Sequence, residues 1–187
     1  MNIGVLGGTF DPPHDAHLRI AERSIDQFNL DRVIFIPSGN PWQKKDATSY
    51  RHRYEMTKIL IGDSNDLEIS DIENSEEKPS YTYETLKKLN HPKEELYFIL
   101  GSDAAINIKT WKNYELLSNL TNFLIALRSE DNIDVLEKNF PFNYEIISGD
   151  KLDLSSTTLR NKLKEKNIEV SDLPSEILTY IKENSLY

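Results

Sequence analysis

Short apolar stretches rich in β-forming residues alternate along this chain with longer segments of helical periodicity. Strands are predicted at about residues 3–7, 33–36, 67–70, 96–100, 123–127 and 144–147. Helices are predicted at about residues 14–28, 50–61 and 82–89, and from near residues 111, 156 and 174. Strands that are apolar throughout and separated by helices are typical of a parallel sheet with both faces covered. The sequence therefore predicts an α/β protein with a Rossmann-like, doubly wound parallel sheet and helices on both faces.

The size and charge of the chain exclude several classes of protein. Its 187 residues, 38% of them hydrophobic, suffice for one core of ordinary size, so we expect a single domain over residues 1–187. The 22 basic and 31 acidic residues give a net charge of −9. Such a charge provides no general attraction to nucleic acid or to an anionic membrane, so neither is expected as a partner.

Composition also limits the chemistry and the location. Cysteine is absent, which excludes disulfides, thiol catalysis and cysteine-ligated metals. No apolar run is long enough to span a membrane and no signal-peptide pattern follows Met1, so we expect a cytoplasmic protein. Whether copies of the chain form a homo-oligomer stays open.

The first segment that carries chemistry is residues 7–18, Gly-Gly-Thr-Phe-Asp-Pro-Pro-His-Asp-Ala-His-Leu, which is neither a Walker A loop nor a dinucleotide fingerprint. Gly7 and Gly8 leave a strand, and the spacing of three puts His14 and His17 on one face of the first helical turn. Backbone N–H groups and the helix dipole point the same way, so the segment predicts an anion site. Metal ligation would need more ligands than the nearby Asp11, so no metal site is predicted.

The second such segment is residues 154–160, Leu-Ser-Ser-Thr-Thr-Leu-Arg. The run of hydroxyl residues by itself predicts a helix N-cap. Arg160 lies three positions after Thr157, so a hydroxyl, a guanidinium and backbone N–H groups can converge on one anion.

Two further features concern the loops after the predicted strands. Gly39 and Gly101 each follow a strand, where a glycine lets a ligand approach the backbone closely. Residues 63–77, in contrast, hold seven carboxylates and no basic residue, and we interpret them as a solvated connection.

These motifs resemble those of the nucleotidylyltransferase superfamily, and more narrowly those of the bacterial nicotinate-nucleotide adenylyltransferases. The resemblance runs through nearly the whole chain. Its narrower form rests on the run from Ser80 to Thr82 followed by Thr85, and on Gly101-x-Asp103 followed by Trp111.

Three positions depart from the pattern of that family. Ala16 stands where the superfamily has the glycine of His-x-Gly-His, and Trp42-Gln43 precedes Lys44 where Pro-His is common. Lys112 follows Trp111 where an aromatic residue is frequent, which weakens the expectation of two rings around a pyridine.

The resemblance implies transfer of the adenylyl group of ATP to nicotinate mononucleotide, which gives nicotinate adenine dinucleotide and pyrophosphate in NAD biosynthesis. The phosphate of the mononucleotide is already ionised, so it can attack the α-phosphorus in line without a general base or a covalent intermediate. Catalysis then consists of positioning and of neutralising charge that develops in the transition state. Mg²⁺ is expected as a cofactor, held by phosphate oxygens as MgATP.

The same resemblance implies roles for individual residues. Catalytic contacts to the ATP phosphates are implied for His14, His17, Lys44 and Arg160, with the C-terminal helices closing the phosphate site. Other ATP-binding residues are implied to be Gly7, Gly8, Thr9, Phe10, Gly101, Asp103, Ser156 and Thr157. The nicotinate mononucleotide pocket is implied to comprise Ser80, Tyr81, Thr82, Thr85 and Trp111; Trp111 taken alone would be interpreted as a core residue.

Four basic residues, Lys44, Lys45, Arg51 and Arg53, lie within ten positions of this acidic chain. We interpret Lys45 and Arg51 as parts of a solvated loop.

Three alternative functions stay open at this point. The acceptor of the adenylyl group could be nicotinamide mononucleotide, or it could be phosphopantetheine. A non-catalytic nucleotide-binding domain is the third alternative, since a fold does not determine a function. Retention of His14, His17 and Arg160 together favours an enzyme, because simple binding needs fewer charges.

Overall fold

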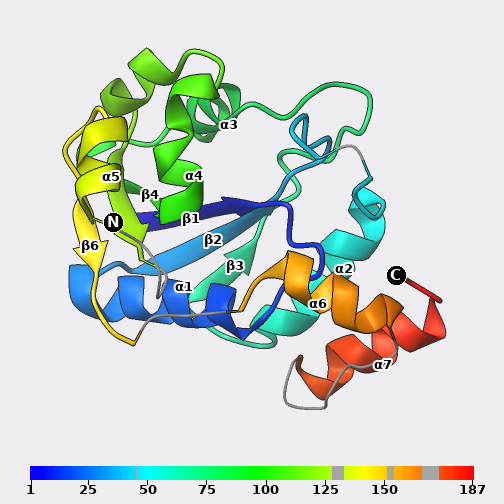
Figure 1. The fold of residues 1–187 in the computed structure, drawn as a ribbon. Helices are drawn as coiled ribbons and strands as arrows, with labels where there is room; N and C mark the ends of the chain where they lie inside the picture. The colour runs from blue at the N-terminus through cyan, green and yellow to red at the C-terminus, as the bar shows by residue number, and fades with distance from the viewer. Residues whose placement is uncertain (45, 128–132, 151–153, 166–172) are drawn as a thin grey trace.

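The computed structural model describes residues 1–44, 46–127, 133–150, 154–165 and 173–187. In this part of the chain a six-stranded sheet has the strand order β3-β2-β1-β4-β5-β6, and each neighbouring pair is parallel (Figure 1). The strands are β1 (Ile3–Gly8), β2 (Arg32–Pro37), β3 (Leu67–Ile69), β4 (Leu96–Gly101), β5 (Asn122–Ala126) and β6 (Glu145–Ile147). All six predicted strands are present, and the predicted Rossmann-like sheet is confirmed.

Helices cover both faces of the sheet (Figure 1). One face carries α1 (Asp15–Phe28), α2 (Tyr50–Ile61), α6 (Ser156–Lys164) and α7 (Ser175–Glu183). The other carries α3 (Thr82–Leu89), α4 (Ser102–Ile106) and α5 (Ile133–Asn139). No helix in the described ranges is both long and apolar enough to cross a membrane.

The strands are apolar along their whole length because each face of the sheet has its own core. In β2, Val33 and Phe35 belong to the core under α1, α2, α6 and α7. The alternate residues Ile34 and Ile36 belong to the core under α3, α4 and α5. Successive strand side chains point to opposite faces, so burial of both faces requires the continuous apolar runs seen in the sequence.

The ends of several helices follow from single residues. Asn29 and Asn90 follow α1 and α3 with φ of 51° and 49°, the left-handed conformation that asparagine tolerates at a helix C-terminus. At the start of α6, the Ser155 hydroxyl oxygen accepts the Thr158 backbone N–H at 3.2 Å. The N-cap predicted from the hydroxyl run is thereby confirmed.

The helix predicted to begin near Trp111 is wrong. Short 3₁₀ helices at Ile108–Thr110 and Tyr114–Asn119 flank an extended Trp111. Asn113 has φ of 56°, and a left-handed residue there interrupts any continuous α-helix. The sequence prediction also missed α4 and α5, which span five and seven residues and are too short to show helical periodicity.

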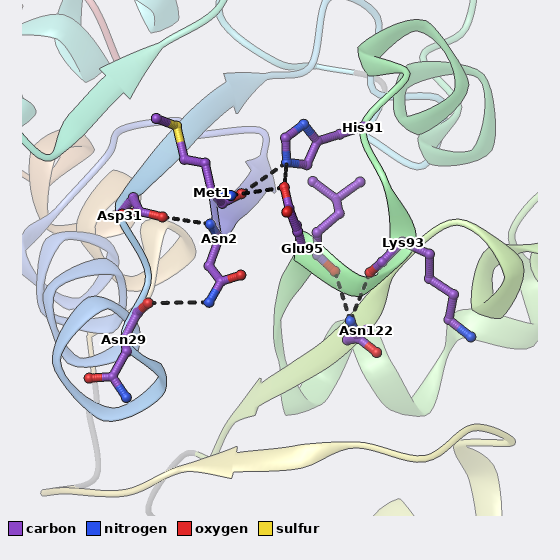
Figure 2. Close-up of polar contacts among 9 residues, drawn as sticks. Met1, Asn2, Asn29, Asp31, His91, Lys93, Glu95 and Asn122 are labelled. Carbon is purple, nitrogen blue, oxygen red and sulfur yellow. Dashed lines mark hydrogen bonds and ion pairs between the residues drawn. The ribbon is translucent and has the colours of Figure 1, made fainter.

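Polar contacts join the loops at the amino ends of β1 and β4 (Figure 2). The Asn2 backbone N–H donates to the Asp31 carboxylate at 2.6 Å, and His91 Nε2 lies 3.0 Å from the Met1 carbonyl oxygen. The Met1 amino group lies 2.9 Å from the Glu95 carboxylate. These contacts hold the edge of the sheet opposite to the carboxyl ends, where open α/β sheets bind their ligands.

Candidate active site

A cavity of about 740 Å³ opens at the carboxyl ends of β1 and β4, the central strands at which the strand order reverses. Ligands of doubly wound sheets bind at this reversal, and the volume lies within the usual range for small-molecule sites. The apolar side chains that the strands contribute to it are Val5, Ile36, Phe98 and Leu100. The cavity is therefore the candidate active site.

Most of the residues predicted from the sequence line this cavity. From the predicted ATP site these are Gly7, Gly8, Thr9, Lys44, Gly101 and Asp103, and from the predicted acceptor pocket Ser80, Tyr81, Thr82, Thr85 and Trp111. The others lie on the β1–α1 loop, in the first turn of α1 or on α6 and do not line it: Phe10, His14, His17, Ser156, Thr157 and Arg160.

The two histidines lie together at the start of α1. His14 is the N-cap residue with an extended backbone, and its backbone N–H donates to His17 Nδ1 at 3.2 Å. The two rings lie 3.9 Å apart between centroids. Because Nδ1 of His17 accepts a hydrogen bond, Nε2 is the atom that carries its proton in the neutral ring. The histidine pair thus has a defined donor, as a phosphate site requires.

Helix α6 packs its amino end against the β1–α1 loop. The Ser156 hydroxyl donates to the Pro12 carbonyl oxygen at 2.9 Å, and Arg160 Nη1 donates to the Asp11 carbonyl oxygen at 2.7 Å. Arg160 Nη2 donates to the Thr157 hydroxyl oxygen at 3.2 Å. The structure therefore brings together the two segments for which the resemblance implied contacts to the ATP phosphates.

Lys44 lies in the loop between β2 and α2 and lines the cavity. Although the residue as a whole is exposed, desolvation of the ammonium group is the main cause that lowers the pKa of Lys44 from its ordinary value of 10.5, and the Arg160 charge lowers it further. Asp103 and Asp11 act in the opposite direction. Lys44 therefore lies among charges of both signs, and a bound anion would favour its charged form.

Arg53 holds the loops around the site together by hydrogen bonds. The side chain is 1% exposed, and it donates to the carbonyl oxygens of Thr48 at 2.6 Å, Thr9 at 2.8 Å and Gly39 at 3.1 Å. A buried guanidinium with three carbonyl partners ties the β1–α1 loop to the loop between β2 and α2. The sequence showed Arg53 as part of a basic run but did not predict this role. Lys45, from the same basic run, lies outside the described residues.

The amino end of α3 forms the opposite wall of the cavity. The Ser80 backbone N–H donates to the Asn40 carbonyl oxygen at 3.0 Å, and the Ser80 hydroxyl oxygen accepts the Asn40 N–H at 3.2 Å. Tyr81 is the N-cap residue, and Thr82 begins the helix. The N–H of a first-turn residue such as Thr82 has no acceptor within its own helix, so this wall presents backbone donors and a partial positive charge.

Glu73 corrects the interpretation of residues 63–77 as a solvated connection. It is half-buried and lines the cavity, and its carboxylate accepts a short hydrogen bond from the Thr85 hydroxyl. Burial raises the pKa of Glu73, and hydrogen bonds from Thr85 and Ser80 oppose that rise. The hydroxyl proton of Thr85, a predicted acceptor-pocket residue, is thus engaged by Glu73.

Gly39 also has a different explanation from the one expected. A Cβ at this position would lie 1.9 Å from the Glu73 carbonyl oxygen, so glycine is required by the close approach of two backbones. Phe10 likewise acts in packing: its side chain is 2% exposed and its ring lies edge-on to His17, with centroids 5.0 Å apart. Because the side chain is buried, only the backbone of Phe10 could contact a nucleotide.

Aromatic side chains line the cavity near the amino end of α3. Trp111 is partly buried, lines the cavity and packs edge-on against Phe98 at 6.2 Å between centroids. Trp42 also lines it, with its ring centroid 6.4 Å from that of Tyr81. The Lys112 ammonium lies 4.5 Å from the Tyr81 ring centroid, so the position after Trp111 contributes a cation in place of a ring.

The whole chain is similar to proteins of one known family. The model of the cytidylyltransferase-like family matches residues 5–162. A probable nicotinate-nucleotide adenylyltransferase of Clostridium novyi is 40% identical, over 98% of this chain and 98% of its own length.

The chain belongs to the cytidylyltransferase-like family.

Solved structures agree with this assignment. The structure of Plasmodium falciparum nicotinic acid mononucleotide adenylyltransferase complexed with NaAD is similar with a TM-score of 0.83 and 28% identity, over 100% of this chain and 97% of that one. The same enzyme complexed with APC gives a TM-score of 0.80 and 26% identity, over 100% of this chain and 96% of that one. The resemblance of the sequence to nicotinate-nucleotide adenylyltransferases within the family is thereby confirmed.

The described part of this cytidylyltransferase-like chain holds no cage of metal-ligating side chains. Among the described residues no group of three or more histidine, aspartate or glutamate side chains is placed to hold a metal ion. Structural metal sites take most of their ligands from the protein, whereas Mg²⁺ in nucleotide sites takes phosphate oxygens and water. The residues present therefore fit a metal only as part of a bound nucleotide.

Three side chains around this family's site have contacts that the sequence did not reveal: Arg53, Glu73 and Tyr187. The Tyr187 hydroxyl donates to the Asp11 carboxylate at 2.5 Å across 176 positions of sequence. Such a contact leaves no local pattern in the sequence. Only relatives in which positions 11 and 187 change together could have pointed to it.

Proposed function

We propose that this chain transfers the adenylyl group of ATP to nicotinate mononucleotide, with nicotinate adenine dinucleotide and pyrophosphate as products. This reaction belongs to NAD biosynthesis. One observation carries the proposal: the cavity is lined by the glycines at the end of β1 and by Lys44, and it is also lined by the amino end of α3 beside aromatic rings. The family membership and the names of the relatives support the same reaction.

The triphosphate would bind at the β1–α1 loop. In this proposal His17 Nε2 donates to a phosphate oxygen, Lys44 approaches from the next loop, and Arg160 holds the leaving pyrophosphate at the amino end of α6. Arg160 already lies in place because the Asp11 carbonyl oxygen and the Thr157 hydroxyl orient its guanidinium. Charge that develops on the phosphate oxygens is then met by donors that need no rearrangement.

The mononucleotide would bind at the α3 end of the cavity. Its pyridine ring stacks on Trp111, and its carboxylate accepts backbone N–H groups at the start of α3, where the helix dipole favours an anion. Its 5′-phosphate then faces the α-phosphorus of ATP. Because this phosphate is already an ionised nucleophile, holding the two groups in line supplies the catalysis, and no side chain has to form a covalent bond to the adenylyl group.

A divalent metal, used generally in adenylyl transfer from ATP, would enter this site with the nucleotide. Mg²⁺ held on the phosphate oxygens supplies charge neutralisation when bound. The reaction takes place between small molecules, and we propose ATP and nicotinate mononucleotide as the partners. A cytoplasmic location stays a prediction.

The test is release of pyrophosphate from ATP and Mg²⁺ in the presence of nicotinate mononucleotide, nicotinamide mononucleotide or phosphopantetheine, with ATP alone as the blank. We expect release that depends on an acceptor and is fastest with nicotinate mononucleotide. Preference for another acceptor would reassign the substrate, and ATP binding without turnover would make the chain a binding domain. A His17→Ala variant should retain the fold and lose about 10²–10³-fold in turnover, which ties the activity to this chain.

A further inference from the structure

A buried carboxylate belongs to the β1–α1 loop, where the triphosphate is proposed to bind. Asp11 is 3% exposed, and both of its carboxylate oxygens have partners. The Tyr187 hydroxyl donates to Oδ1 at 2.5 Å, and the Thr48 backbone N–H donates to Oδ2 at 3.2 Å. The negative charge of Asp11 is therefore held by two neutral donors.

Cations surround this carboxylate, but no salt bridge joins it to any of them within the described part of the chain. Arg160 donates to the backbone carbonyl oxygen of Asp11, and Arg53 donates to carbonyl oxygens of the flanking loops. Asp11 still lies close enough to raise the pKa values of Lys44 and Arg53, against the larger effect of their burial. The carboxylate and the phosphate-binding cations thus share one small region.

The end of the chain reaches this region by a reversal after α7. The Leu186 backbone N–H donates to the Ile181 carbonyl oxygen at 3.0 Å, and Ser185 has a left-handed φ of 51°. The side chains of Leu186 and Tyr187 pack against the core that lies under α1, α2, α6 and α7. Burial and the Asp11 charge raise the pKa of Tyr187, so its hydroxyl stays protonated and remains a donor.

Loss of the Tyr187 hydroxyl would leave one oxygen of a buried carboxylate without its donor. An unsatisfied buried charge is costly, and a nearby ammonium or guanidinium is the strongest partner that it could recruit. Lys44 and Arg160 are the cations next to the phosphate site, and pairing with Asp11 would withdraw them from an incoming triphosphate.

We propose that Tyr187 is a positioning residue for ATP: its hydroxyl occupies the Asp11 carboxylate and so leaves Lys44 and Arg160 to the phosphate oxygens. This inference rests on the proposed binding of ATP at the β1–α1 loop. It assigns to the segment after α7 a part in substrate affinity, beyond the packing of its side chains.

The test compares Tyr187→Phe, Asp11→Asn and the double variant, with Tyr180→Phe as the matched control. Tyr180 lies in α7 and hydrogen-bonds another side chain, with its hydroxyl 2.9 Å from His52 Nδ1. Calorimetry measures the Kd for ATP, steady-state kinetics measure KM for each substrate, and thermal melting checks the fold.

Tyr187→Phe should raise the Kd and KM for ATP about tenfold, the effect of one hydrogen bond to a charged group, with little change in KM for the acceptor. Addition of Asp11→Asn should restore ATP binding to within about twofold, because the neutral amide no longer recruits a cation. Tyr180→Phe should leave the Kd for ATP unchanged.

An unchanged Kd for ATP in Tyr187→Phe would overturn the inference, and so would a double variant that binds ATP no better than Tyr187→Phe. Equal increases in both KM values with a lower melting temperature would show a merely structural role, which also overturns it. The Kd for ATP is measured without an acceptor, so it tests this inference independently of the proposed reaction. If these Kd values are as expected but the unmodified protein shows no turnover with nicotinate mononucleotide, the proposed function is wrong and the inference stands.

Discussion

At the scale of single residues, the sequence identified the groups with chemical character and missed those that hold them. Glycines after strands, a histidine pair and an arginine one turn after a hydroxyl all leave local patterns, and the structure brings them together. The roles of Arg53, Glu73 and Tyr187 leave none, because they depend on contacts between separate segments: Arg53 reaches Thr9 across 44 positions, and Tyr187 reaches Asp11 across 176. Long-range contacts of this kind follow from the fold and not from spacing.

Arg160→Lys is expected to act as a substantial change although the charge is the same. The guanidinium reaches the Asp11 carbonyl oxygen and the Thr157 hydroxyl with two nitrogens, and an ammonium cannot reproduce that fork. We expect the KM for ATP to rise about 10- to 100-fold, as for the loss of a charge-assisted hydrogen bond. Lys162→Arg, a basic substitution on the same helix, is the control; an unaltered ATP dependence in Arg160→Lys would remove Arg160 from the phosphate site.

The pH dependence of ATP binding should report Lys44. Its pKa is lowered, chiefly by desolvation of the ammonium group and then by Arg160, so the ammonium loses its proton below the ordinary 10.5 as the pH rises. As the pH is raised, the Kd for ATP should therefore begin to increase at a pH below 10.5. A guanidinium stays charged throughout, so Lys44→Arg should remove this alkaline limb whatever its affinity at neutral pH. The same limb in Lys44→Arg as in a Lys58→Arg control would mean that another group titrates.

At the scale of helices and strands, periodicity predicted the long elements and failed for the short ones. The six strands and the helices beginning near residues 14, 50, 82, 156 and 174 are present within a residue or two. The segment from Ser102 to Asn119 instead contains one short α-helix and two 3₁₀ helices. Its residues up to Lys112 contribute to the wall of the cavity, and the left-handed Asn113 interrupts any continuous helical repeat.

The start of α3 offers a sharp test of acceptor choice. Proline is tolerated at the first helical position, and Tyr81 has φ −122° and ψ 123°, a conformation compatible with a following proline. Thr82→Pro should therefore preserve the helix and remove one backbone donor, with about a tenfold loss in kcat/KM for nicotinate mononucleotide and a smaller loss for nicotinamide mononucleotide.

Two variants complete this comparison. Thr82→Ala retains the N–H and should do modest harm. Trp111→Ala should weaken both mononucleotides alike, by about tenfold, because stacking does not distinguish a carboxylate from an amide. A selective loss of nicotinate in Trp111→Ala, or equal use of the two acceptors by the unmodified protein, would show that the carboxylate binds elsewhere.

At the scale of the whole molecule, the parallel order of the strands explains why one cavity can hold two substrates. The crossovers bring the loops after β1, β2 and β4 to one edge, and α3 and α6 direct their amino ends to the loops of that edge. The fold class follows from the alternation of strands and helices, and so could be predicted. The closure of the phosphate site by α6 could be predicted only by resemblance, because segments 144 positions apart meet there.

The most direct test of the account is the initial rate of pyrophosphate release with ATP and nicotinate mononucleotide varied together. Direct transfer between two substrates held in one cavity predicts intersecting double-reciprocal plots and no release of pyrophosphate without the mononucleotide. Parallel plots, or a burst of pyrophosphate from ATP alone, would indicate a covalent adenylyl-enzyme and would contradict catalysis by positioning and charge.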